Sequence, residues 1–264
     1  MPVLITGAET AEGRAAARRL ARSGGEVRVF VAMETPDAVV EVFRSSGCKV
    51  ARGSLDDEGH LETAAEQVHT VVHLAGGPMT PPDTVLDDAA TVLSAAIGAG
   101  CRRLVWASHV GADDPRGNAY LEACAETEAM LADAPLETVV IRRALTYGPD
   151  DALTAALAAG SMPPQAVEST HQPLYVDDLG MVIAEADRVR GGVGDLGIVL
   201  TLTGPTEVLL GGFADLLAAP QRNRATAPAL PPAVADLLTR DLVVNEALVG
   251  PTSIPEGLER VSWE

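Results

Sequence analysis

The stretch VLITGAETAEGRAAARRLA, residues 3–21, joins a short apolar run to an alanine-rich helical segment through a turn that contains Gly7 and Gly13. This order is typical of the first strand, turn and helix of a βαβ unit. One glycine permits the tight bend, and the second lets the helix pack closely on the strand. The backbone N–H groups that open such a helix, together with its dipole, favour an anionic pyrophosphate.

The alternation of short valine-rich runs with longer helical segments continues along the chain. It predicts parallel strands joined by crossover helices, that is, an α/β fold of Rossmann type with a doubly wound parallel sheet. We expect strands at residues 3–6, 27–32, 49–51, 70–74, 103–108, 138–141 and 197–202. We expect helices at residues 11–23, 36–45, 57–67, 84–99, 120–132 and 176–188.

The pattern loosens from about Ala144 onward, where proline clusters interrupt it. Because 264 residues with 47% apolar content suffice for one large core, we expect a single domain over residues 1–264. Residues 145–175 and 203–264 are expected to contribute most of a small C-terminal lobe on the substrate side. Asp177 and Asp178 stand at the start of a predicted helix and are expected to cap it.

Composition limits the partners and the compartment. The chain has 37 acidic and 19 basic residues, a formal net charge of −18, which disfavours nucleic acid and anionic lipid and promotes solubility. It contains no run of about 18 apolar residues, so we expect no membrane association. Its three cysteines are far apart and no cluster has metal-ligand spacing, so we expect no metal and a reducing cytoplasm. The oligomeric state stays open.

Further landmarks follow the opening turn in a characteristic order: VVHLAG (71–76), LVWAS (104–108), Tyr120 with Glu128, IR (141–142), YGP (147–149) and VDDL (176–179). With these landmarks the chain resembles the atypical, NmrA-like and extended short-chain dehydrogenases/reductases over roughly residues 3–178. The opening motif of that family is TGxxGxxG. The resemblance implies a nicotinamide dinucleotide as cofactor and a small molecule as substrate.

The resemblance also implies which residues contact the cofactor. They lie in the opening turn, after the second strand, after the third strand, after the fourth strand and after the sixth strand. The predicted cofactor-binding residues are Gly7, Thr10, Ala11, Glu12, Gly13, Arg14, Ala32, Ser54, Leu55, Ala75, Gly76, Gly77 and Ala144.

Several of these positions depart from the family pattern. Thr10 replaces the middle glycine, and its side chain either crowds the pyrophosphate or supplies a hydroxyl to it. Ala32 stands where the family often has an acidic residue for a ribose 2′-hydroxyl or an arginine for a 2′-phosphate, and Ser54 replaces an aspartate beside the adenine. Arg14 is either a partner for a 2′-phosphate or a solvated helix residue. The first option favours NADP(H) slightly over NAD(H).

The predicted catalytic residues are Ser108, His109 and Tyr120. In the family a tyrosine donates a proton to the carbonyl, and a lysine four residues later lowers its pKa. Here Cys124 replaces that lysine, so we expect the pKa of Tyr120 to stay near its ordinary value of about 10. His109 occupies the position of the family's catalytic serine or threonine and is expected to donate to, or shuttle protons with, a carbonyl oxygen.

Three functions remain open. The first is an NAD(P)H-dependent ketoreductase for a small or polycyclic carbonyl compound, similar to the atypical reductases of aromatic polyketide pathways in antibiotic biosynthesis. The second is a non-redox cyclase, dehydratase or isomerase that uses His109 as acid and base, motivated by the missing lysine and by Thr10. The third is a non-catalytic NmrA-like sensor of dinucleotide redox state.

Overall fold

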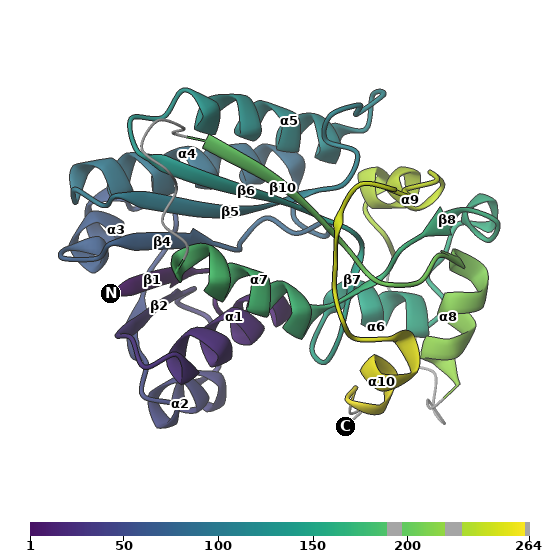
Figure 1. The fold of residues 1–264 in the computed structure, drawn as a ribbon, viewed down its shortest axis with the longest axis horizontal. Coiled ribbons are helices and arrows are strands. Elements are labelled where there is room, and N and C mark those ends of the chain that lie inside the picture. The colour runs from purple at the N-terminus through teal and green to yellow at the C-terminus, as the bar shows by residue number, and fades with distance from the viewer. Residues whose placement is uncertain (189–196, 220–228, 262–264) are drawn as a thin grey trace.

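The computed structural model describes residues 1–188, 197–219 and 229–261; parts of the lobe expected at 203–264 thus lie outside the described residues. A parallel eight-stranded sheet in the order β12-β10-β6-β5-β4-β1-β2-β3 forms its centre (Figure 1). Its strands are β1 (Val3–Thr6), β2 (Val27–Val31), β3 (Lys49–Arg52), β4 (Thr70–His73), β5 (Arg103–His109), β6 (Glu137–Arg143), β10 (Gly197–Thr203) and β12 (Leu248–Val249).

Helices cover both faces of this sheet, as the predicted Rossmann-type fold requires (Figure 1). On one face lie α1 (Ala11–Arg22), α2 (Asp37–Ser45) and α7 (Val176–Arg188). On the other lie α3 (Glu58–Ala65), α4 (Pro82–Gly98) and α5 (Ala119–Ala132). Successive residues of β5 alternate between the two cores, with Val105 in the first and Trp106 in the second, because side chains of a strand point to opposite faces in turn.

The strand order reverses between β1 and β4, which are hydrogen-bonded neighbours although they are separated by two strands in the sequence. In a doubly wound sheet the crevice beyond the carboxyl ends of two such strands is where a ligand binds. Gly7 follows β1 directly, and Ala75 lies just beyond the end of β4. The topology therefore places the glycine turn at this crevice.

The predicted strands and helices are confirmed with end points shifted by a few residues. β6 extends to Arg143, two residues beyond the predicted end, because its backbone stays paired with both neighbouring strands there: Arg143 lies opposite His109 of β5 and Leu202 of β10. The sequence pattern missed β12, which is two residues long. Within the described ranges, no helix has both the length and the apolar character needed to cross a bilayer.

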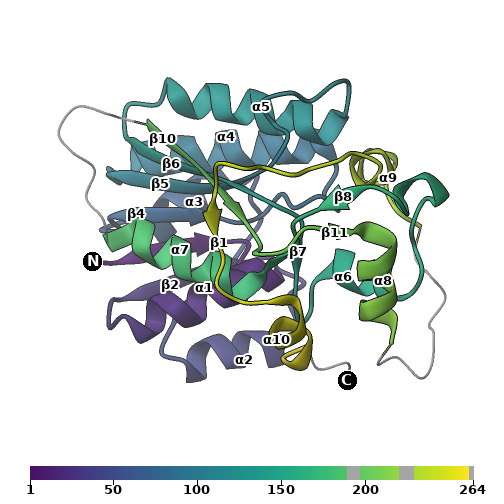
Figure 2. The ribbon, with the colours of Figure 1, turned by 45° about the vertical axis from the view of Figure 1, so that its right-hand side comes forward.

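The rest of the described chain forms smaller elements at one end of the sheet (Figure 2). They share a third apolar core, in which Tyr147, Phe213 and Leu238 are fully buried. These elements are β7 (Thr146–Tyr147), α6 (Ala152–Ala158), the short 3₁₀ helix η1 (Pro164–Ala166), β8 (Thr170–His171), β9 (Leu174–Tyr175), β11 (Val208–Leu209), α8 (Leu210–Ala218), α9 (Pro232–Leu238) and α10 (Ile254–Glu259). That they hold the substrate stays a prediction.

Asp178 anchors the C-terminal segment instead of capping a helix. Helix α7 begins at Val176, so Asp177 and Asp178 both lie inside its first turn. The buried carboxylate of Asp178 accepts hydrogen bonds from the backbone N–H of Thr252 at 2.9 Å and from its hydroxyl at 2.7 Å. The expected capping role of Asp178 is therefore wrong, because its donors come from a segment 74 residues away.

Candidate functional site

Two glycines shape the turn after β1. Gly7 has φ +72°, and a Cβ there would lie 2.3 Å from the backbone nitrogen of Ala75. A Cβ on Gly13 would lie 2.2 Å from the carbonyl oxygen of Gly7. Neither approach is sterically possible, so both positions require glycine. The turn thus packs on β4 and on helix α1 as closely as a pyrophosphate-binding turn must.

Thr10 caps helix α1 and keeps its side chain within the turn. Its hydroxyl donates to the carbonyl of Gly7 at 2.8 Å and accepts from the backbone N–H of Gly13 at 3.0 Å. The Thr10 hydroxyl therefore makes both of its hydrogen bonds within the turn. The first-turn amides of Ala11 and Glu12 belong to the set that an α-helix leaves without intrahelical acceptors. These donors, the helix dipole and the glycine cradle fit the diphosphate of a dinucleotide.

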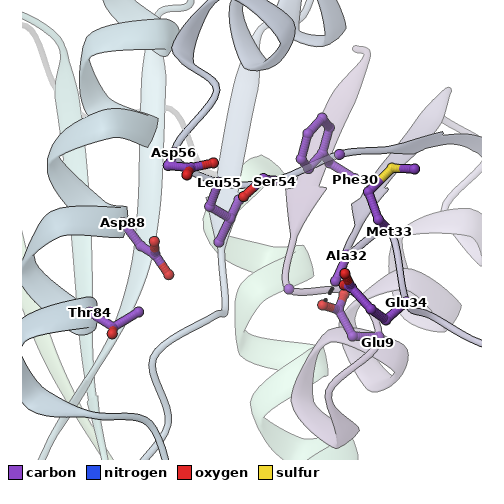
Figure 3. Close-up of a pocket in the computed structure, with 12 residues that line it drawn as sticks. Glu9, Phe30, Ala32, Met33, Glu34, Ser54, Leu55, Asp56, Thr84 and Asp88 are labelled. Atoms are coloured by element: carbon purple, nitrogen blue, oxygen red, sulfur yellow. Dashed lines mark hydrogen bonds between the residues drawn. The ribbon is translucent and has the colours of Figure 1, made fainter.

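A cavity of about 370 Å³ opens on one side of the turn, between the ends of β2 and β3 and helix α4 (Figure 3). Four predicted cofactor-binding residues line it: Gly7, Ala32, Ser54 and Leu55. Four acidic residues that were not predicted from the sequence also line it: Glu9, Glu34, Asp56 and Asp88. Burial and the neighbouring carboxylates Asp87 and Asp56 raise the pKa of Asp88 to about 6.

A second cavity, of about 170 Å³, is lined by Thr10, Ala11, Glu12 and Gly77 of the predicted set, together with Met79 and residues 150–153. Four more of the predicted cofactor-binding residues line neither cavity and make packing contacts or backbone hydrogen bonds nearby. Gly13 and Ala75 pack against Gly7, Gly76 offers its carbonyl to Tyr120, and Ala144 donates its N–H to Leu202.

Arg14 does not face the cavity beside Ala32. Its Nη1 lies 2.6 Å from the carboxylate of Asp150, and its Nε donates to the backbone carbonyl of Glu9 at 3.0 Å. Asp150 lines the second cavity. The arginine that favoured a 2′-phosphate in the sequence analysis is therefore engaged elsewhere, since tertiary folding brings Asp150 to it from 136 residues away.

Of the three predicted catalytic side chains, the structure brings His109 and Tyr120 together. Their rings meet edge to face with centroids 5.8 Å apart, and each residue is at most 1% exposed. Ser108 is also buried, but its hydroxyl donates to the carboxylate of Glu128 at 2.5 Å, and Glu128 is paired with Arg142. Ser108 is therefore already bonded inside the protein.

His109 is a neutral hydrogen-bond acceptor at the end of β5. Burial, and then the nearby charge of Arg143, lower its pKa to about 3. Its Nδ1 lies 2.8 Å from the carbonyl oxygen of Val110, which assigns the proton to Nδ1 and leaves Nε2 bare. Within the described residues Nε2 is buried without a partner. The expectation that His109 donates to a carbonyl oxygen does not fit this tautomer, because Nε2 is a hydrogen-bond acceptor. That His109 takes part in catalysis stays a prediction.

Tyr120 is fully buried, and its hydroxyl donates to the carbonyl of Gly76 at 3.4 Å. Burial, followed by the adjacent Cys124 thiol, raises its pKa well above 10. The expectation of a pKa near the ordinary value is thus wrong. It took into account the missing lysine but not burial, which disfavours the charged phenolate and raises the pKa further. At neutral pH the phenol keeps its proton and serves as a donor.

The cation at this site is Arg143, which the sequence analysis did not select. Its buried guanidinium bonds to the Glu12 carboxylate at 2.5 Å and donates to the backbone carbonyls of Ala107 and Ser108. Burial lowers its pKa, but Glu12, Tyr120 and Cys124 together raise it by more, so the net shift is upward. A charged residue at the end of a buried strand was the available signal, since such a residue needs a partner.

Residues 7–162 match the model of a protein family described as NAD(P)H-binding. A curated relative from Streptomyces griseus, a (4-alkanoyl-5-oxo-2,5-dihydrofuran-3-yl)methyl phosphate reductase, is 31% identical over 119 residues. That match covers 45% of this chain and 38% of the length of the reductase.

Solved structures of the extended class share the fold. A UDP-glucose 4-epimerase from Thermotoga maritima superposes with a TM-score of 0.75 at 18% identity, over 99% of this chain and 97% of the epimerase. A dTDP-glucose 4,6-dehydratase double mutant from Streptomyces venezuelae, with NAD bound, gives 0.73 at 18% identity, over 99% and 95% of the two chains. The predicted resemblance to the extended dehydrogenases/reductases is confirmed at the level of the fold.

Proposed function

Because the chain belongs to the NAD(P)H-binding family, we propose that it is an NAD(P)H-dependent reductase of a small carbonyl compound. The observation that carries this proposal is the juxtaposition of a glycine cradle for a diphosphate with His109 and Tyr120 at the carboxyl end of the same sheet. The Streptomyces griseus reductase supports it, since the name of that enzyme describes a ring that carries oxo and alkanoyl groups. Arg14 gives no reason to prefer NADPH, so the proposal covers both dinucleotides.

A bound dihydronicotinamide supplies the hydride, which goes to the carbonyl carbon. Tyr120 then has the role of the acid. Its O–H turns from the long contact with Gly76 to the carbonyl oxygen, gives its proton to the forming alkoxide, and is reprotonated from solvent. A phenol with a raised pKa still protonates an alkoxide, which is the stronger base. No step requires Tyr120 to be ionised in the resting protein.

His109 has a different role in this mechanism, because its Nε2 is a bare acceptor. It accepts a hydrogen bond from a hydroxyl on the substrate and so orients the carbonyl beside Tyr120. This favours substrates that carry a hydroxyl near the reacting carbonyl, such as the polycyclic hydroxyketones suggested by the resemblance to polyketide reductases. Arg143 faces the same group of residues and supplies positive charge near the forming oxyanion.

The test is consumption of NADH or NADPH, followed by absorbance, with acyl-furanones, their phosphate esters and polycyclic hydroxyketones as substrates. Tyr120→Phe should lower kcat by about 10²- to 10⁴-fold while the dinucleotide Kd stays the same. Tyr147→Phe is the matched control, because it removes the hydroxyl of an equally buried tyrosine in the third apolar core. Equal activity in Tyr120→Phe and the wild type would refute the assigned role.

A second candidate, a non-redox cyclase, dehydratase or isomerase, is favoured by the unpartnered Nε2 of His109, whose lone pair is free to accept a hydrogen bond from a reacting group of a substrate. It predicts turnover by protein stripped of nucleotide, which the reductase proposal forbids. Tight dinucleotide binding without turnover of any compound tested would instead support the sensor.

A further inference from the structure

The end of strand β2 lacks a polar side chain of its own. Ala32 stands there and lines the larger cavity. Glu9 reaches this position from a different loop, the glycine turn after β1. One of its carboxylate oxygens, Oε1, accepts from the backbone N–H of Ala32 at 3.4 Å (Figure 3). The two loops are adjacent because β1 and β2 are paired, with Thr6 opposite Phe30.

The other carboxylate oxygen of Glu9, Oε2, is buried and has no hydrogen-bond partner among the described residues. Burial raises the pKa of Glu9, while the backbone N–H groups of Glu9 and Ala32 lower it to a smaller extent. A buried carboxylate oxygen without a donor is costly, so it is complementary to a ligand that brings one. A ribose diol offers two neighbouring hydroxyl donors.

The remaining charges around this cavity have the same sign. Glu34, Asp56 and Asp88 line it together with Glu9, and none of the lining residues in the described part of the chain is a lysine or arginine. Figure 3 shows Glu34 beside Glu9 and Asp88 across the cavity on helix α4. A phosphate on the ribose would therefore meet the carboxylates that line the cavity. The charge of Arg14 acts on Glu9 and offsets part of the rise in pKa that burial causes, but Arg14 is not among the lining residues and is paired with Asp150.

We propose that Glu9 selects the cofactor: its carboxylate binds the adenosine ribose hydroxyls of NAD(H) and repels the 2′-phosphate of NADP(H). The inference rests on dinucleotide binding by this chain, and it reverses the slight preference for NADP(H) expected from the sequence. Glu9 thus does the work of an acidic residue at the end of β2, although it comes from the glycine turn.

The test is a calorimetric titration of the full-length protein with NADH and with NADPH, which needs no substrate. We expect NADH to bind about 10- to 100-fold more tightly than NADPH, the difference made by one hydrogen bond to a charged group. Glu9→Gln removes the charge but keeps an acceptor for the Ala32 N–H, and it should bring the two Kd values together. Glu9→Ser combined with Ala32→Arg should reverse the preference.

Asp88→Asn is the control, since it removes a charge from the opposite wall of the same cavity and should change the ratio of the two Kd values less than Glu9→Gln does. The proposal is overturned if the wild type binds NADPH as tightly as NADH, or if Glu9→Gln leaves the ratio unchanged in a folded protein, as judged by circular dichroism. In both cases the reductase proposal survives. If neither dinucleotide binds, both proposals fall.

Discussion

The His109 side chain should make the free energy of unfolding of the wild type fall as the pH drops from 7 to 5. Replacing His109 with asparagine should make this fall smaller by about 2 kcal/mol. The pKa of His109 falls from an ordinary value of 6.5 to about 3 through burial and the charge of Arg143. Between pH 7 and pH 5 the unfolded chain therefore binds a proton that the folded chain does not. Falling pH then favours the unfolded state, and the stability from the neutral, buried imidazole is progressively lost.

The magnitude follows from the two pKa values. With an unfolded pKa of 6.5 and a folded pKa far below 5, the free energy of unfolding drops by about 1.9 kcal/mol between pH 7 and pH 5. In His109→Asn this contribution is absent, and the asparagine amide keeps a donor for the Val110 carbonyl. The wild type also contains Asp88 and Asp151, whose pKa values burial raises to about 6, and these stabilise the folded state as pH falls. Both proteins contain these two aspartates, so the difference between their free energies of unfolding at each pH reports on His109 alone.

The assay is urea unfolding of both proteins at pH 7, 6 and 5. The variant should be less stable at pH 7, and the gap should close by about 2 kcal/mol at pH 5. Val105→Ala, a neighbouring core truncation on β5, is the control and should lose the same free energy at every pH. Parallel stability curves for His109→Asn and the wild type would refute the assignment of a neutral, buried imidazole.

Three local contacts give further tests. Gly13→Ala should abolish dinucleotide binding in calorimetry, because its Cβ would lie 2.2 Å from the Gly7 carbonyl oxygen; unchanged binding would contradict the cradle. Thr10→Ala should lower the free energy of unfolding by about 1 kcal/mol through loss of the α1 cap, whereas Thr10→Ser should keep most of it. Thr252→Val should cost about 1–3 kcal/mol by leaving the buried Asp178 carboxylate without its hydroxyl donor, and a neutral result in urea unfolding would argue against this anchor.

The glycine turn illustrates what local sequence predicts well. Val3–Thr6, the turn and helix α1 are contiguous, so apolar pattern and glycine placement specify them without knowledge of the rest of the chain. The same holds for the alternation of apolar and helical segments that predicts the parallel sheet and its helices, since each strand and helix can be predicted from its own contiguous residues. The crevice between β1 and β4 then follows from the strand order of the Rossmann-type fold.

The chemistry of the site depends on contacts between distant segments. Arg143 meets Glu12 across 131 residues, and Arg14 meets Asp150 across 136. The protonation of His109 and Tyr120 depends on burial, which no residue type reveals by itself. For this reason the sequence selected His109 and Tyr120 but did not select Arg143, and it did not anticipate that Nε2 of His109 is an acceptor or that the pKa of Tyr120 is raised.

Sequence alone thus determined the fold, the family and the position of the glycine turn, because these properties follow from short, contiguous patterns of hydrophobicity and glycine. Only the tertiary structure decided that Glu9 lies at the end of β2 beside Ala32 and that Arg143 is a buried cation whose charge acts on His109 and Tyr120. Charge and desolvation act through space, so their effect on a side chain is set by neighbours that the chain brings together only when it folds.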